Sequence, residues 1–177
     1  MIKFDSQSDT ATASEGHKIE ACRKGVIRLT SQRYPFCANG PVDSDNSIRS
    51  GMSLVPFNQQ LNRFMLFVTQ LDSPKAKIIW GQHSVVVSAE QLTNGVNLAT
   101  LFPNNPFNAA FNEVDSAVAT KQAYETQQIK QVFHGKEGKR DIESAVARTE
   151  KERAILVAKI ASAKSAVTHQ ITIQAAE

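Results

Sequence analysis

The sequence predicts an α+β fold, in which a small β-sheet or β-sandwich-like domain has a long antiparallel helical hairpin inserted before its last strand. Before Pro106, short runs alternate apolar and polar residues, as half-buried strands do. After Pro106 the apolar residues recur at helical spacing. The final "AVTHQITIQ" returns to strict alternation. We therefore expect a β-rich domain at 1–105, the helical hairpin at 106–165 and a closing strand at 166–177.

The first elements are a pair of strands and a long loop. "HKIEACRKGVIRLT" contains two strand-like runs around Lys24 and Gly25, and the glycine suits a tight turn. The stretch 34–51 is rich in Pro, Gly, Asn, Asp and Ser, which predicts a loop throughout. A loop of this length is either functional or a cover. Next come a helical turn in "PFNQQLNR" and a strand in "FMLFVTQL".

A hairpin and a capped helical turn follow. The runs 77–80 and 84–87 flank Gly81 and Gln82, which is a β-hairpin signal. In "SAEQLTNGVNLA", Ser88 and Gln91 have the spacing of a capping box. Gly95 is expected to end that short helix in a left-handed conformation.

Two amphipathic helices and a strand complete the chain. "GKEGKR" separates the helices, and a short connection favours an antiparallel pair. Arg153 interrupts the second apolar stripe, with its head group expected at the rim. The first stripe comprises Phe111, Val114, Val118, Ile129 and Val132. The second comprises Ile142, Val146, Thr149, Leu156, Ile160 and Ala163. In the closing strand, the inward residues are expected to be Val167, His169, Ile171 and Ile173.

Charge and hydropathy exclude several classes of protein. The net charge is +3, and Lys and Arg alternate with Glu and Asp in "HGKEGKRDIESAVARTEKERA", which indicates a solvated helical surface and no nucleic-acid partner. The sequence contains no run of about 18 apolar residues, so no membrane span is predicted. The start "MIKFDSQSDTATASEG" lacks the basic and apolar regions of a signal peptide.

No sequence motif predicts a metal, a cofactor or a catalytic residue. The histidines at 17, 83, 134 and 169 lie in no HExxH, HxH or CxxC setting. No GxSxG, Walker loop or GxGxxG is present, so no cofactor is expected. Cys22 and Cys37 either form one disulfide, as in an exported protein, or are two small buried hydrophobes.

A few polar and aromatic residues are candidates for binding. Trp80, beside Gly81, fits an exposed platform for a sugar or, more commonly for a strand tryptophan, a core position. Asn62 and Arg63, with Asn58, form a polar group beside "VPF". This group suits a partner, and capping or loop hydrogen bonds explain it equally well.

The order of several pieces resembles the C-terminal region of bacterial GDSL-type SGNH hydrolases. These pieces are "YPF", "VPFNQQLNRFMLFVTQL", a Trp-Gly hairpin, "SAEQLTNGVNLA", "NPF", a "KQAYETQ" helix and "AVTHQITIQ". In that family an "LPFP" loop, a "PFxxxLNRxxLxVxGL" strand, an "SAxxLxxGINLA" turn and a "PVTHxxxI" strand follow the esterase domain. The family's GDS serine and DxxH block have no counterpart in this sequence.

The resemblance implies a non-catalytic accessory domain of an ester hydrolase acting on acylated carbohydrate, which helps to form or hold the substrate site. The implied partner is an SGNH catalytic domain, in cis or in trans, and the implied location is periplasmic or secreted if the parent esterase is exported. Asn97 and the hairpin from Trp80 to His83 would then contact the catalytic domain, unless they only close the local fold. The alternative is a stand-alone binding or assembly module that uses the helical hairpin as its partner surface.

Overall fold

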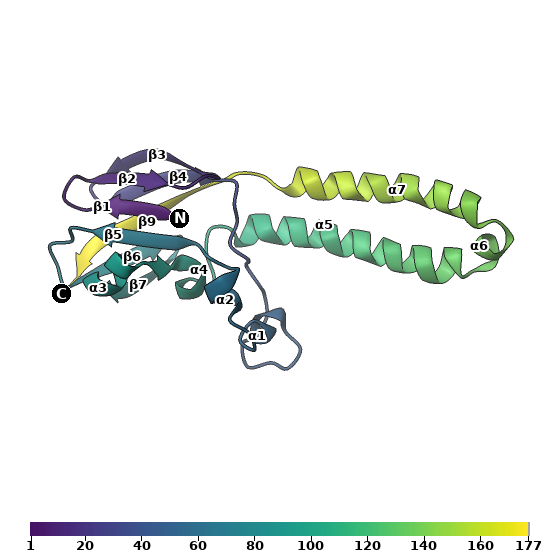
Figure 1. Ribbon diagram of the computed structural model, residues 1–177, viewed down its shortest axis with the longest axis horizontal. Helices are drawn as coiled ribbons and strands as arrows, with labels where there is room; N and C mark the ends of the chain where they lie inside the picture. Colours follow the sequence, from purple (N-terminus) through teal and green to yellow (C-terminus); the bar gives the residue numbers. More distant parts are fainter. Residues whose placement is uncertain (177) are drawn as a thin grey trace. The chain divides into compact units, whose positions relative to one another are not determined.

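The structure is a computed structural model that describes residues 1–176 (Figure 1). It contains two compact units. The β-unit consists of Met1–Asn108 together with the segment that starts at Ala166, and the helical unit consists of Ala109–Ser165. The predicted α+β class, with a long helical pair before the last strand, is confirmed.

The smaller sheet of the β-unit has the strand order β2-β1-β5-β8. Its first strand, β1, pairs in parallel with β5, with Ile2 opposite Leu66, and its other pairings are antiparallel. Parallel neighbours need a long crossover, which the chain between them supplies. The strands are β1 (Ile2–Asp5), β2 (Thr10–Ala13), β5 (Met65–Thr69) and β8 (Val96–Asn97).

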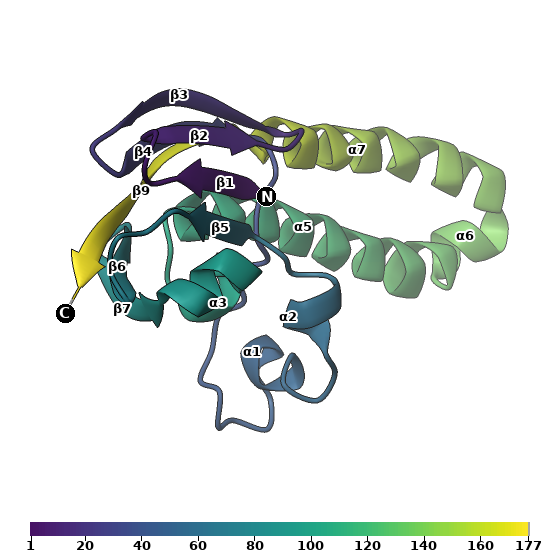
Figure 2. The same ribbon diagram turned by 60° about the vertical axis from the view of Figure 1, so that its left-hand side comes forward.

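The larger sheet has the strand order β3-β4-β9-β6-β7, and all its pairings are antiparallel (Figure 2). The predicted closing strand, β9, lies at its centre, with Ile171 opposite Ile27 and Ile173 opposite Ile78. The last strand is therefore part of the core of the sheet. The strands are β3 (His17–Arg23), β4 (Val26–Ser31), β6 (Lys75–Trp80), β7 (His83–Ser88) and β9 (Val167–Ala176).

An aromatic cluster joins the two sheets. Phe64, just before β5, lies with its ring centroid 5.1 Å from that of Trp80 on β6 and 5.8 Å from that of His169 on β9. Phe107 contacts the same three rings at 4.8 to 5.9 Å. Tilted and edge-to-face contacts at these distances stabilise a core beyond the area that they bury. The expected inward face of β9 is confirmed for His169, Ile171 and Ile173, which are all buried.

The turns and the helix cap that the sequence predicts are present in the structure, with one difference. Lys24 and Gly25 both have positive φ, as the turn between β3 and β4 requires, and Gly81 has positive φ between β6 and β7. The capping box of Ser88 and Gln91 starts helix α3 (Ala89–Asn94). Gly95 has the expected positive φ, 91°, but its ψ of 128° lies outside the left-handed helical region. It leads directly into β8.

The segment predicted as a loop, 34–51, ends in a short helix. Ser47 caps helix α1 (Ile48–Gly51) by accepting a hydrogen bond from the Ser50 amide. The expected turn in "PFNQQLNR" is helix α2 (Phe57–Gln60), and helix α4 (Leu98–Leu101) follows β8.

The helical unit is a pair of long helices, α5 (Asn108–Gln127) and α7 (Ile142–Ala163), which lie side by side in both views. A π-helical turn, η1 (Gln128–Phe133), and a short helix, α6 (Lys136–Arg140), connect them. The segment predicted as a break is thus partly helical. Among the described residues, no helix has the length and apolar character that crossing a bilayer requires.

The apolar stripes of the helical unit agree with the prediction only in part: Thr149 and Leu156 are buried as expected, but other positions differ. Gln128 is buried and donates a hydrogen bond to Thr149 Oγ1 over 2.9 Å, whereas Ile129 is exposed. The π-helical turn explains this, because its wider turn shifts the face that later residues present. Ile142 and Val146 are also exposed, and Ala145 is buried in their place. Arg153 lies at the rim as expected, with its Nε 2.7 Å from Glu125 Oε1 on α5.

Candidate functional site

Two of the predicted binding residues hold the polypeptide between β4 and β5 in place. Asn62 is buried, and its side chain accepts a hydrogen bond from the Phe36 amide and donates one to the Phe36 carbonyl, at 2.8 and 3.1 Å. Asn97 Oδ1 accepts from the Phe64 amide at 2.9 Å, and its Nδ2 donates to the carbonyls of Asn58 and Asn62, each at 2.8 Å. The side-chain amides of Asn62 and Asn97 therefore hold the local fold together, which is one of the two interpretations that the sequence allows.

The other predicted residues lie apart. Trp80 has no exposed surface, so it is not a sugar-stacking platform but a core residue. His83 pairs with it in the hairpin register but is exposed. Arg63 is exposed, directly before buried Phe64. Cys22 and Cys37 are free thiols and form no disulfide with each other. Burial is the main cause that raises the pKa of each thiol, so both are weak nucleophiles.

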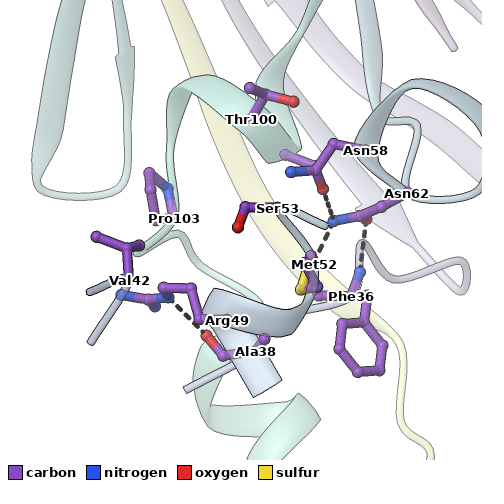
Figure 3. A pocket seen from close by; sticks show the side chains of 11 residues that line it. Phe36, Ala38, Val42, Arg49, Met52, Ser53, Asn58, Asn62, Thr100 and Pro103 are labelled. Atoms are coloured by element: carbon purple, nitrogen blue, oxygen red, sulfur yellow. Dashed lines mark hydrogen bonds between the residues drawn. The ribbon is translucent and has the colours of Figure 1, made fainter. Parts of the chain in front are cut away.

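One cavity, of about 230 Å³, opens beside the segment held by Asn62; we call it the loop pocket (Figure 3). Arg49 is the single titratable side chain in its lining, and its Nε donates to the Ala38 carbonyl over 3.0 Å. Ser53 also lines the pocket, but its hydroxyl donates to the Ser50 carbonyl and has no base beside it in the lining. The pocket can hold a small molecule but offers no acid–base pair. Its lining is Phe36, Ala38, Val42, Arg49, Met52, Ser53, Asn58, Asn62, Ala99, Thr100 and Pro103.

A larger cavity, of about 560 Å³, lies beside the N-terminal strand of the β-unit; we call it the basic pocket. Its side chains are mainly aromatic and cationic, and no Asp or Glu lines it. The cationic side chains are those of Arg33 and Arg63, with the imidazole of His17 beside them. The remaining lining residues are Met1, Ser14, Tyr34, Phe36, Phe57, Leu61, Asn62, Phe64, Met65 and Phe67.

A chain of hydrogen bonds runs from the aromatic cluster to the basic pocket. Trp80 Nε1 donates to His169 Nδ1 over 3.0 Å, His169 Nε2 lies 3.0 Å from Ser31 Oγ, and Ser31 Oγ lies 2.8 Å from His17 Nδ1. Trp80, His169 and Ser31 are buried. Three strands of the larger sheet, β3, β4 and β9, place the serine between the two imidazoles, because His17 is opposite Ser31 in the register.

The direction of these bonds follows from the donors. An indole N–H only donates, so His169 Nδ1 accepts and its proton is on Nε2. Ser31 then accepts from His169, and its own hydroxyl hydrogen goes to His17 Nδ1. This places the proton of neutral His17 on Nε2. Burial is the main cause that lowers the pKa of both histidines to about 4, so both are neutral at pH 7.

The Ser31–His17 distance is one that a nucleophile and its base can have. However, Ser31 has no exposed surface, so an ester carbonyl has no access to its hydroxyl. We therefore interpret this chain of hydrogen bonds as structural. Sequence reasoning did not single out Ser31 or connect it with the histidines. Strand alternation placed His169 on the inward face, but only the order of the strands brings the three side chains together. Among the described residues, no group of His, Cys, Asp and Glu has a metal-binding arrangement.

Comparisons with known proteins show the fold and no family. No family model and no curated protein matches the sequence. A solved structure described as a gut microbial diltiazem-metabolizing enzyme superposes with a TM-score of 0.62 at 16% sequence identity. The match covers 99% of this chain and 49% of the enzyme's chain, so this chain spans about half the length of that enzyme. At this identity, the similarity is one of fold.

Proposed function

We propose that this chain is the accessory region of an ester hydrolase, in cis or in trans, and that it helps to form or hold a substrate site for an acylated carbohydrate. The motif order described above supports this assignment. The similar solved structure supports the accessory part of it, because the fold of this chain accounts for about half of an enzyme. The buried position of Ser31 agrees with a role in which another polypeptide supplies the nucleophile.

The observation that carries the proposal is the number of exposed apolar side chains in the segment between β4 and β5. Leu54 and Leu61 are 84% and 75% exposed. Large apolar side chains that gather on a surface mark an interaction site more often than a solvated one. Two exposed apolar residues of this segment, Phe36 and Val42, also line the loop pocket, so a catalytic domain that covers them would cover that pocket. The exposed residues of this segment are Phe36, Val42, Ile48, Leu54, Val55 and Leu61.

The experiment pairs this chain with the polypeptide encoded next to it in the same reading frame or operon. The chain alone is expected to hydrolyse neither 4-nitrophenyl acetate nor an O-acetylated sugar. The pair is expected to co-purify and to hydrolyse the acetylated sugar faster than the neighbour alone. Leu54→Ser with Leu61→Ser should weaken the pair, whereas Val86→Ser, which changes an exposed residue of β7, should not.

Two results would contradict the proposal. The first is ester turnover by the chain alone that a serine-reactive phosphonate abolishes. The second is a pair whose stability and activity are unchanged by the double substitution. Circular dichroism and Trp80 fluorescence of each variant separate a lost interface from a lost fold.

A second candidate is a binding or assembly module that works through the helical unit. The observation that favours it is a set of exposed apolar residues on α7, namely Ile142, Val146, Ile155 and Val157. Light scattering after size exclusion tests it directly. Self-association that Ile155→Ser with Val157→Ser abolishes, and that the loop substitutions leave unchanged, would favour this candidate.

A further inference from the structure

The basic pocket has walls that suit a flat apolar body. Rings from three separate segments line it, among them Phe36, Phe57 and Phe67. Phe36 and Phe57 meet edge to face at 5.4 Å, and Phe67 is partly exposed. The volume of about 560 Å³ is in the range of small-molecule sites. An aromatic ligand can therefore pack on side chains that are already ordered by contacts with each other.

The charge of the pocket is unbalanced. Arg33 and Arg63 line it, and neither guanidinium forms a hydrogen bond or an ion pair with residues 1–176. On the helical unit, in contrast, Arg148 and Arg153 each pair with a glutamate. With no carboxylate in the lining, two guanidinium groups are available to a ligand. The planar donors of arginine match a carboxylate, which they bind through two parallel hydrogen bonds.

Two local features place donors at the pocket. The stem of Arg33 lies where a side chain at position 16 would be, and Gly16, at φ 86°, leaves that space open. His17 Nδ1 is occupied by Ser31, so its Nε2–H is the free donor of the ring. Among the described residues, no fully buried side-chain nitrogen lacks a partner, so His17 Nε2 keeps some exposed surface. The buried chain of hydrogen bonds thus fixes which hydrogen His17 presents.

We propose that the basic pocket binds an aromatic carboxylate, with the carboxylate held by Arg33 and Arg63, assisted by His17 Nε2–H, and the ring held against the aromatic wall. Inorganic anions would use the charges but not the rings, and neutral aromatics would use the rings but not the charges. Both groups of residues face one cavity, which favours a ligand that carries both features. This proposal rests on the pocket alone and does not depend on the accessory role proposed above.

Calorimetry with the full chain at pH 7 tests the proposal, with 2-naphthoate as the probe, 2-naphthamide as its neutral match and inorganic phosphate as the simple anion. We expect 2-naphthoate to bind at least about tenfold more tightly than either comparison compound, since a charge-assisted hydrogen bond has about this effect. Arg33→Gln and Arg63→Gln should each weaken 2-naphthoate binding about tenfold. Arg28→Gln removes the same charge from an exposed position on β4 outside the pocket lining, and it should change binding less than twofold.

Each other outcome overturns the proposal. Equal affinity for 2-naphthoate and 2-naphthamide would show that the guanidinium groups do not recognise the ligand. Phosphate binding as tight as 2-naphthoate binding would show a general anion site. No heat of binding at millimolar 2-naphthoate, or equal losses in the Arg28 variant, would show that the pocket does not take this class of ligand. Arg33 and Arg63 are both exposed, and circular dichroism of each variant separates a loss of binding from a loss of fold.

Discussion

Replacing Ser31 by alanine removes the central group of the chain that links Trp80, His169 and His17. The substitution deletes one oxygen atom and leaves the backbone of β4 able to form the same strand. His169 Nε2–H then loses its acceptor in a buried site, and His17 Nδ1 loses its donor. Because His17 is only partly buried, water can replace the lost bond there. His169 has no such replacement.

The expected cost follows from the single donor that is left without a partner. A buried donor without an acceptor costs about 1–3 kcal/mol, so Ser31→Ala should lower the free energy of unfolding of the β-unit by about 2 kcal/mol. The small change of volume adds little to this value. Thr30→Ala is the matched control: it also removes a hydroxyl from β4, but its partner, Thr168 Oγ1, is exposed. The control should cost less than about 0.5 kcal/mol.

Urea unfolding followed by Trp80 fluorescence measures both variants. Trp80 is the single tryptophan of the chain and is a member of the buried cluster, so its emission reports on the β-unit. The helical unit is followed separately by far-ultraviolet circular dichroism. If Ser31→Ala and Thr30→Ala have equal stabilities, the hydrogen bonds between Ser31 and the histidines do not contribute as argued, and the assigned protonation of His169 is wrong.

Three further results are expected. Acidification should destabilise the β-unit, because an unfolded histidine binds a proton near pH 6.5, whereas buried His169 binds one only near pH 4. This difference lowers the free energy of unfolding in urea titrations by about 3 kcal/mol between these pH values, and partly buried His17, whose pKa is also about 4, adds a smaller loss. His169→Gln should therefore remove the share of His169 and leave that of His17. Asn97→Ala should cost about 3 kcal/mol by the same fluorescence assay, since it leaves three backbone groups of a partly buried segment unpaired, and a stability equal to wild type would contradict this. Gly95→Ala should cost at least about 2 kcal/mol, because φ is positive and the new Cβ would overlap the ring of Phe67, and a smaller thermal shift than for Gly51→Ala would refute it.

Features that depend on neighbours in sequence were predictable from it. The turn at Lys24 and Gly25, the capping box of Ser88 and the alternation of β9 are all governed by interactions within a few residues. The two long helices follow from spacing in the same way. The first apolar stripe was predicted less well where it continues from α5 into η1, because a π-helical turn changes the number of residues per turn and no local signal in the sequence indicates it.

The candidate sites depend on contacts between residues that are distant in sequence, and only the tertiary structure decided them. The central position of β9 brings His169 to Ser31, and the register of β3 on β4 brings His17 to the same hydroxyl. Arg33 follows β4 and Arg63 precedes β5, and they share a cavity only because the chain between them folds back. Periodicity predicts which face of an element is buried, because the spacing of apolar residues belongs to that element alone. It does not report which other element covers that face, since the pairing of strands depends on the free energy of the whole arrangement.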